Sequence, residues 1–162
     1  MRILYFHGWG GRPSGTFATF LGENGYDVVD PHLPSLEGVE GFQVAVKVGQ
    51  EAFDQCQPDL IVGFSRGGGV AINIDSGSVP LVLIAPDWRF KEGRETVKRK
   101  ALILHSPEDL TINWYASKML LANSELPEKG HLIEVRGGHS QMKEPPALEA
   151  LLDAIKQVLM ID

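Results

Sequence analysis

Residues 63–67, Gly-Phe-Ser-Arg-Gly, begin at the end of an apolar run at residues 60–64. This G-x-S-x-G pattern is typical of a sharp strand-to-helix turn, where a strained backbone makes the serine hydroxyl project from the main chain. Glycine is needed two residues before and after Ser65, because side chains at those positions would collide. The alternative is a glycine-rich turn in which Ser65 only caps a helix. In the first interpretation Ser65 is a candidate nucleophile.

A serine hydroxyl attacks a carbonyl carbon only when a base takes its proton, and the base must be held in one tautomer. We expect His139 to be this base, because it lies in a Gly-Gly-His-Ser loop at residues 137–140, between an apolar run and a predicted final helix. The other four histidines belong to strand ends or to other loops; they are His7, His32, His105 and His131.

The carboxylate that would orient His139 has three candidates in the sequence. Asp109 follows the apolar run 101–105, Glu108 lies beside it, and Asp87 follows the run 81–85. We favour Asp109, which keeps the order serine, acid, histidine with each residue after the end of a run, and Glu108 and Asp87 are its rivals. The alternative role for any of these carboxylates is a helix cap or a solvated loop group.

A glycine-rich loop, His-Gly-Trp-Gly-Gly at residues 7–11, follows the first apolar run. Acyl transfer places negative charge on an oxygen, and each backbone N–H group aimed at it is worth about 10²–10³ in rate. We expect these donors to be the N–H groups of Trp9 and Arg66. A phosphate-binding loop is disfavoured, since neither G-x-G-x-x-G nor a P-loop lysine is present. Four aromatic side chains would shape the substrate pocket if their loops converge: Trp9, Phe17, Trp88 and Trp114.

These residues must be positioned by the elements between them. Six short apolar runs read as strands buried on both faces; they are 3–6, 26–30, 60–64, 81–85, 101–105 and 132–135. Segments of helical period alternate with them; they are 14–24, 39–56, 66–75, 88–99, 112–123 and 146–159. This alternation predicts an α/β fold, a three-layer α/β/α sandwich with a mostly parallel sheet of about six strands. Ligands bind at the carboxyl ends of such strands.

The composition excludes several classes of protein. The 162 residues favour a single domain over residues 1–162, and the net charge of −6 argues against a nucleic-acid partner. The single cysteine, Cys56, excludes an internal disulfide and fits a reducing compartment, and it belongs to no metal-ligand cluster. No apolar run is long enough for a membrane span or a secretory signal. We therefore expect a cytoplasmic protein that does not contact a membrane.

One stretch is locally basic and contains Arg89, Lys91, Arg94, Lys98, Arg99 and Lys100. With Glu92 and Glu95 between them, these residues are expected to form a solvated helix face. The alternative is that the stretch borders the site and attracts an anionic substrate.

Four segments together resemble the α/β-hydrolase superfamily: residues 7–8, 63–68, 105–109 and 137–140. The chain is most similar to its compact members, small bacterial esterases of the YqiA kind and serine hydrolases of the retinoblastoma-binding-protein type. This resemblance implies an α/β-hydrolase fold that lacks the N-terminal antiparallel strands of larger members. It also implies no cap domain, because only a short segment separates the runs 81–85 and 101–105.

We therefore expect a serine hydrolase that cleaves carboxylic esters or thioesters of a small-molecule acyl substrate through an acyl-enzyme. Ser65, Asp109 and His139 would form its triad, with no metal and no organic cofactor. Amidase, peptidase or acyl-transferase chemistry would use the same residues and stays open. A non-catalytic binding module on the same fold is the alternative from another class. The physiological substrate and the oligomeric state are not defined by the sequence.

Overall fold

The structure, a computed structural model that describes residues 1–162, contains one six-stranded sheet whose neighbouring strands are all parallel. The strands are β1 (Arg2–Phe6), β2 (Asp27–Val29), β3 (Leu60–Phe64), β4 (Leu81–Ile84), β5 (Ala101–His105) and β6 (Leu132–Glu134). Their order across the sheet is β2-β1-β3-β4-β5-β6. Every residue of β3, β4 and β5 is buried, as expected for central parallel strands covered on both faces.

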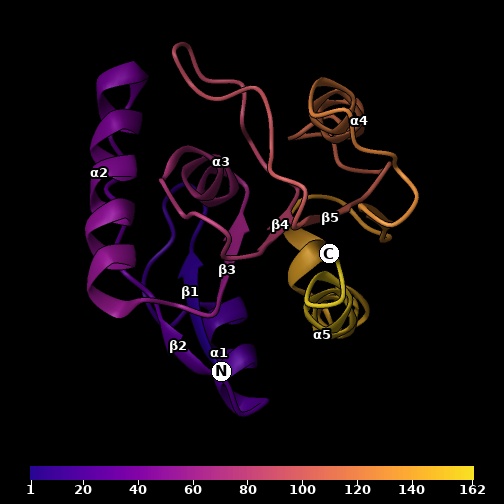
Figure 1. The fold of residues 1–162 in the computed structure, drawn as a ribbon, viewed down its shortest axis with the longest axis horizontal. Helices are drawn as coiled ribbons and strands as arrows, with labels where there is room; N and C mark the ends of the chain where they lie inside the picture. The colour runs from indigo at the N-terminus through magenta and orange to yellow at the C-terminus, as the bar shows by residue number, and fades with distance from the viewer.

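Five α-helices and one short 3₁₀ helix lie between these strands or after the last of them. They are α1 (Thr16–Glu23), α2 (Gly38–Cys56), α3 (Arg66–Asn73), α4 (Trp114–Asn123), the 3₁₀ helix Ser140–Lys143 and α5 (Pro145–Val158). Helices α1 and α5 cover one face of the sheet, and α2, α3 and α4 cover the other (Figure 1). The predicted three-layer sandwich without a cap domain is confirmed. None of the helices has the length and apolar character that a membrane span requires.

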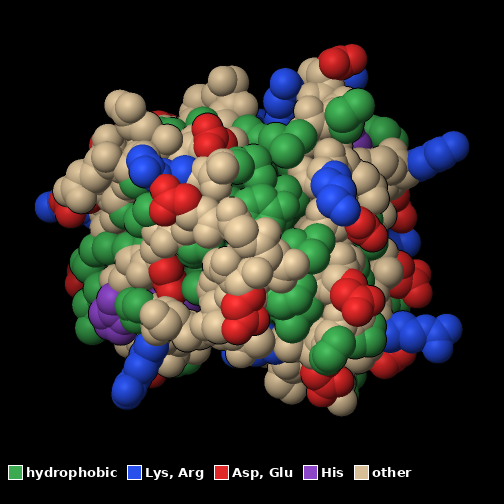
Figure 2. Space-filling view, turned by 90° about the horizontal axis from the view of Figure 1, so that it is seen from below, with side chains coloured by type: hydrophobic (Ala, Val, Ile, Leu, Met, Phe, Trp, Pro, Cys, Tyr) green, Lys and Arg blue, Asp and Glu red, His purple; other side chains and the backbone are tan.

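The side chains of each strand alternate between two separate cores, because successive residues of a strand point to opposite faces. In β1, Ile3 and Tyr5 pack in the core beneath α1 and α5, whereas Leu4 and Phe6 pack beneath α2 and α3. On the face seen in Figure 2, acidic and basic side chains are interspersed among apolar and neutral ones. The two buried cores lie between the sheet and the helices on either side of it.

The parallel arrangement brings the loops that follow the strands to one edge of the sheet. The loops after β1, β3, β5 and β6 contain the glycine-rich segment 7–11, Ser65, Asp109 and His139, respectively. Residues far apart in the sequence are thus delivered to one place by topology alone.

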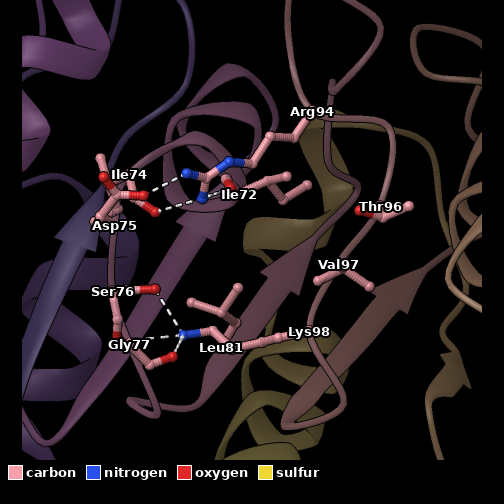
Figure 3. Close-up of a pocket in the computed structure, with 10 residues that line it drawn as sticks. All are labelled: Ile72, Ile74, Asp75, Ser76, Gly77, Leu81, Arg94, Thr96, Val97 and Lys98. Carbon is pink, nitrogen blue, oxygen red and sulfur yellow. Dashed lines mark hydrogen bonds and ion pairs between the residues drawn. The ribbon is translucent and has the colours of Figure 1, made fainter.

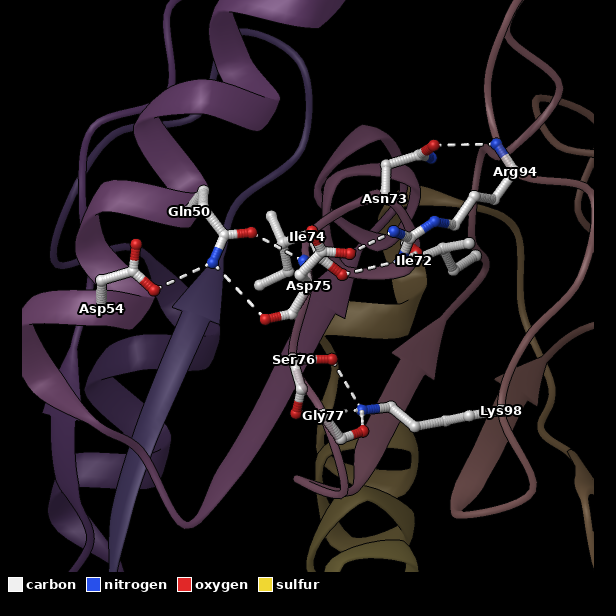
Figure 4. A network of polar contacts seen from close by, with 10 residues as sticks. All are labelled: Gln50, Asp54, Ile72, Asn73, Ile74, Asp75, Ser76, Gly77, Arg94 and Lys98. Carbon is white, nitrogen blue, oxygen red and sulfur yellow. Dashed lines mark hydrogen bonds and ion pairs between the residues drawn. The ribbon is translucent and has the colours of Figure 1, made fainter.

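The predicted helix at residues 88–99 is wrong, and so is the solvated helix face assigned to its basic side chains. This segment has no helix, and Glu92 within it adopts a positive φ of 67°. The Arg94 guanidinium instead donates hydrogen bonds to the carbonyl oxygens of Ile72 and Ile74, at 3.2 and 2.9 Å, and pairs with Asp75 (Figure 4). Arg94 therefore satisfies carbonyl groups that the end of α3 leaves without helical partners.

Lys98 belongs to the same segment and holds the turn that follows α3 (Figure 3). Its ammonium group donates to the Ser76 hydroxyl at 2.6 Å and to the Gly77 carbonyl at 2.9 Å. Burial, with a smaller contribution from the charge of Arg94, lowers the pKa of Lys98 to about 8. Both basic side chains thus act within the fold, at the end of α3 opposite to Ser65.

The other predicted strands and helices are present, with ends that differ from the prediction by two residues at most.

Candidate active site

Ser65 lies between β3 and α3 in a strained backbone conformation, with φ of 53° and ψ of −120°. Two hydrogen bonds hold this turn: the Ser65 N–H donates to Ile84 at 2.9 Å, and the Asp87 N–H donates to the Ser65 carbonyl at 2.9 Å. A Cβ atom at Gly67 would collide with the carbonyl oxygen of Phe6. The glycine that the pattern places after Ser65 is therefore needed because β1 passes directly against the turn.

Ser65, His139 and Asp109 form one chain of hydrogen bonds. The Ser65 Oγ lies 3.0 Å from His139 Nε2, and His139 Nδ1 lies 2.7 Å from Asp109 Oδ2. Because a carboxylate only accepts, the proton of neutral His139 is on Nδ1, and Nε2 is free to accept from the serine hydroxyl. The Phe64 ring stacks on the imidazole with 4.9 Å between ring centroids. This arrangement makes His139 a base directed at Ser65.

The Asp109 carboxylate is buried and fully hydrogen-bonded. Its Oδ1 accepts the backbone N–H groups of Thr111 and Ile112, both at 2.8 Å. Burial alone would raise the pKa of Asp109, but the hydrogen bonds from His139 and from these two N–H groups outweigh it, so the pKa is lowered. The group is therefore a carboxylate at neutral pH, as the partner of a histidine must be.

The two alternative carboxylates have other surroundings. Glu108 accepts the N–H of Gly137 at 3.1 Å, which ties the loop after β5 to the loop that carries His139. Asp87 makes no hydrogen bond to His139, and burial raises the pKa of its carboxyl group against the nearby charges of Arg89, His139 and Arg66. Of the three carboxylates, Asp109 is the one that the structure pairs with His139.

His105 lies next to the hydrogen-bonded residues Ser65, His139 and Asp109. Its position at the end of a predicted strand did not indicate this contact. Its ring is fully buried, and its Nε2 lies 3.0 Å from the Ile112 carbonyl and 3.3 Å from Asp109 Oδ2. A carbonyl only accepts, so Nε2 carries the proton and Nδ1 accepts from the Ser117 hydroxyl at 2.7 Å. In the sequence, the one indication of this contact is that Asp109 follows His105 by four residues, just after the end of β5.

The backbone N–H groups of Trp9 and Arg66 have no acceptor within the protein, which leaves both free to bind an oxyanion. The loop carrying Trp9 is held in shape by His7, whose Nδ1 donates to the Gly8 carbonyl at 2.8 Å. The Nε2 atom of His7 accepts the N–H of Leu33 at 2.9 Å. His7 is thus a buried support of the loop, a role that the sequence reasoning did not assign to it.

The side chain of Arg66 connects three segments around Ser65. Its guanidinium donates to the carbonyls of Pro34 and Leu36, between β2 and α2, and to that of Gly41 in the first turn of α2, at distances of 3.0–3.2 Å. It also lies 5.0 Å from the centre of the Trp9 ring, which is within the range of a cation–π interaction. Burial lowers the pKa of Arg66, and the charge of Asp87 opposes this shift.

Two cavities meet at Ser65. The larger, about 520 Å³, is bordered by both Ser65 and His139 and extends along residues 7–17 to Ser140 and Lys143. The smaller, about 340 Å³, is bordered by Ser65, Arg66 and Asp87 and by four apolar side chains; these are Trp9, Leu36, Phe90 and Ile112. Trp9 and Ser65 border both cavities, so different parts of one ligand bound at Ser65 can lie in each.

The predicted pocket residues Trp88 and Trp114 border neither cavity. Trp88 is buried in the core beneath α3 and α4, and its indole N–H donates to the Ala116 carbonyl at 3.0 Å. Trp114 packs edge-on against His105, with 5.7 Å between ring centroids, at the start of α4. The prediction that these two rings shape the pocket is therefore wrong: their segments do not converge on Ser65, and both rings pack elsewhere. The predicted Trp9 and Phe17 do line the larger cavity.

Several solved structures have the same fold along almost the whole chain. One, from Xanthomonas campestris pv. campestris, is described as a hydrolase of the alpha/beta superfamily; it has a TM-score of 0.74 at 15% identity, over 98% of this chain and 96% of that one. Mouse alpha/beta hydrolase domain-containing protein 10 has a TM-score of 0.73 at 15% identity, and the match covers 98% of this chain and 89% of that one. The Paleococcus ferrophilus monoacylglycerol lipase has a TM-score of 0.66 at 14% identity, and the match covers 98% of this chain and 94% of that one.

No protein-family model and no curated protein sequence matches the chain. At 14–15% identity, the likeness to these solved structures concerns the fold alone. The chain has the fold of small α/β hydrolases without a cap domain.

Proposed function

We propose that the protein hydrolyses carboxylic esters or thioesters of small acyl substrates through an acyl-enzyme, with Ser65 as nucleophile, His139 as base and Asp109 as the acid that orients it. The observation that carries this proposal is the unbroken hydrogen-bond chain from Asp109 through His139 to the hydroxyl of Ser65 on its strained turn. A structural serine needs neither the strain nor an oriented base.

In the first half of the reaction, Ser65 Oγ attacks the carbonyl carbon while its proton passes to His139 Nε2. Asp109 stabilises the resulting imidazolium, and the N–H groups of Trp9 and Arg66 bind the oxyanion of the tetrahedral intermediate. The intermediate then collapses: the bond to the leaving oxygen or sulfur breaks, and that atom takes the proton from His139 Nε2. The products of this half are the free alcohol or thiol and an acyl group on Ser65.

In the second half, a water molecule gives a proton to His139 Nε2 and attacks the acyl carbonyl. Collapse of the second tetrahedral intermediate releases the carboxylic acid and returns the proton to Ser65 Oγ. No metal and no organic cofactor takes part in either half. The proposal is supported by the chemistry of proteins with the same fold, among which are the monoacylglycerol lipase named above and an esterase domain from Rhodothermus marinus.

Hydrolysis of p-nitrophenyl esters from acetate to palmitate tests the proposal, with Ser65→Ala beside the native protein. Loss of a triad serine should lower turnover by about 10⁶. A fluorophosphonate probe should label the native protein at Ser65 and leave the variant unlabelled. A protein that neither hydrolyses any ester nor reacts with the probe would instead be a binding module.

A further inference from the structure

We propose that the leaving alcohol of the substrate carries an anionic group such as a carboxylate, and that Arg12 and Lys143 bind this group in the larger cavity. The inference rests on the proposed function, since it defines which part of an ester lies in which cavity. It concerns side chains that the sequence analysis did not single out.

The chemistry of His139 assigns the two cavities. The leaving oxygen takes its proton from His139 Nε2, so the leaving alcohol must lie on the side of Ser65 that His139 borders. That side is the cavity of about 520 Å³, which contains both Ser65 and His139. The cavity of about 340 Å³ is bordered by Ser65 and by four apolar side chains but not by His139, and it is therefore left for the acyl chain.

The larger cavity is positively charged although the protein has a net charge of −6. Arg12 and Lys143 are among the residues that border it, and no aspartate or glutamate is. Both are exposed, and neither side chain has a hydrogen bond or an ion pair within the protein. Two carboxylates lie behind residues that border it without bordering it themselves: Asp109, bound to His139 Nδ1, and Asp30, whose Oδ2 accepts the N–H of Ser14. Two cations without a carboxylate or hydrogen-bond partner at a reactive serine favour an anionic ligand.

Lys143 and His139 both lie against the ring of Phe64. The Lys143 ammonium lies 5.4 Å from the centre of the Phe64 ring, whose centroid is 4.9 Å from that of the His139 imidazole. Arg12 approaches from the loop after β1, and its planar guanidinium can donate two parallel hydrogen bonds to a carboxylate. Hydroxyl groups of Ser14, Thr16 and Ser140 also border the cavity and provide further donors.

A second cavity is also bordered by two basic side chains, but these already have partners within the fold. A cavity of about 300 Å³ is bordered by Arg94 and Lys98, but their nitrogens already donate to the backbone and side chains that follow α3 (Figure 3). Those two cations are neutralised or hydrogen-bonded within the fold, whereas Arg12 and Lys143 are not. An anion is therefore expected beside Ser65 and not at the far end of α3.

The test compares two esters with the same acyl group and nearly the same shape, 3-carboxyphenyl butyrate and 3-carbamoylphenyl butyrate. The measured quantity is the ratio of kcat/KM for the anionic ester to kcat/KM for the neutral one, each divided by its rate with hydroxide. We expect a ratio of about ten in the native protein, a ratio near one in the Arg12→Gln/Lys143→Gln variant, and a decrease at high salt because exposed charges are screened. Lys129→Gln, an exposed lysine outside the cavity, is the matched control and should keep the native ratio.

A ratio near one in the native protein, or a ratio that survives in the double variant, overturns the proposal. Binding of 3-hydroxybenzoate and 3-hydroxybenzamide to the Ser65→Ala protein separates this result from failure of the proposed hydrolysis. If neither ester is hydrolysed, the hydrolase proposal fails for these esters. Tighter binding of the benzoate that depends on Arg12 and Lys143 would then still support the anion site, and equal binding of both compounds would refute it.

Discussion

Asp109, Glu108 and Asp87 lie on loops at the same edge of the sheet, but each carboxylate has a different environment. Asp109 is held by two backbone N–H groups and by His139, and these hydrogen bonds lower its pKa against the effect of burial. Burial raises the pKa of Asp87, which has no hydrogen bond to the imidazole. A group that must stabilise an imidazolium at neutral pH has to be ionised and directed at the ring, and Asp109 meets both conditions.

We therefore predict that Asp109→Asn lowers kcat for ester hydrolysis by about 10⁴, since an amide favours the wrong tautomer of His139. Asp87→Asn, the matched control, should change kcat by less than about tenfold. Steady-state kinetics on a p-nitrophenyl ester measures both, with circular dichroism to show that each variant is folded. The opposite ranking of the two variants would make Asp87 the acid.

At the scale of elements, the strands and most helices were predictable because their apolar periodicity decides which face is buried. The basic segment 88–99 was not, since its spacing of charges resembles a helix while its hydrogen bonds lie elsewhere in the sequence. Arg94 contacts the end of α3 about twenty residues away. Such long-range partners of an arginine leave no trace in local periodicity. In the same way, the position of Trp88 after β4 does not show that its indole N–H will donate to α4.

We predict that Arg94→Gln lowers the free energy of unfolding by about 1–2 kcal/mol, because carbonyl groups of Ile72 and Ile74 lose charged donors. The side chain of Arg94 is half exposed, so its ion pair with Asp75 contributes little of this amount. Urea unfolding measures the effect. Lys91→Gln removes an exposed charge from the same segment and should change stability by less than about 0.5 kcal/mol. Equal effects of the two substitutions would show that the Arg94 network adds no stability.

At the scale of the whole molecule, the parallel sheet explains why the candidate site could be assembled from the sequence. Ser65, Asp109 and His139 lie on three loops far apart in the chain, and parallel strands bring such loops to one edge whatever the loops contain. The lining of the cavities could not be predicted in this way. Whether Trp114 or Lys143 faces Ser65 depends on how each loop folds after it leaves the sheet, and the order of elements does not determine that.

His105 links the site to the stability of the whole fold. Its fully buried ring connects the end of β5 to α4 through Ser117 and to the loop of Asp109 through Ile112. Burial lowers the pKa of His105, although the charge of Asp109 and the Ile112 carbonyl act in the opposite direction and His139 in the same one. In the unfolded chain a histidine has a pKa of about 6.5. At pH values between the lowered pKa of the folded protein and this value, residue 105 binds more protons in the unfolded chain than in the folded protein.

It follows that the free energy of unfolding should decrease as the pH falls from 7 to 5, because protons then favour the unfolded chain. The His105→Gln variant, which has no proton to take up at this position, should be less stable than the native protein at pH 7 but should lose less stability over the same range. Urea unfolding at a series of pH values measures the slopes. His32→Gln removes an exposed histidine and should keep the native slope. If His105→Gln keeps it as well, then the buried ring of His105 is not the source of the pH dependence.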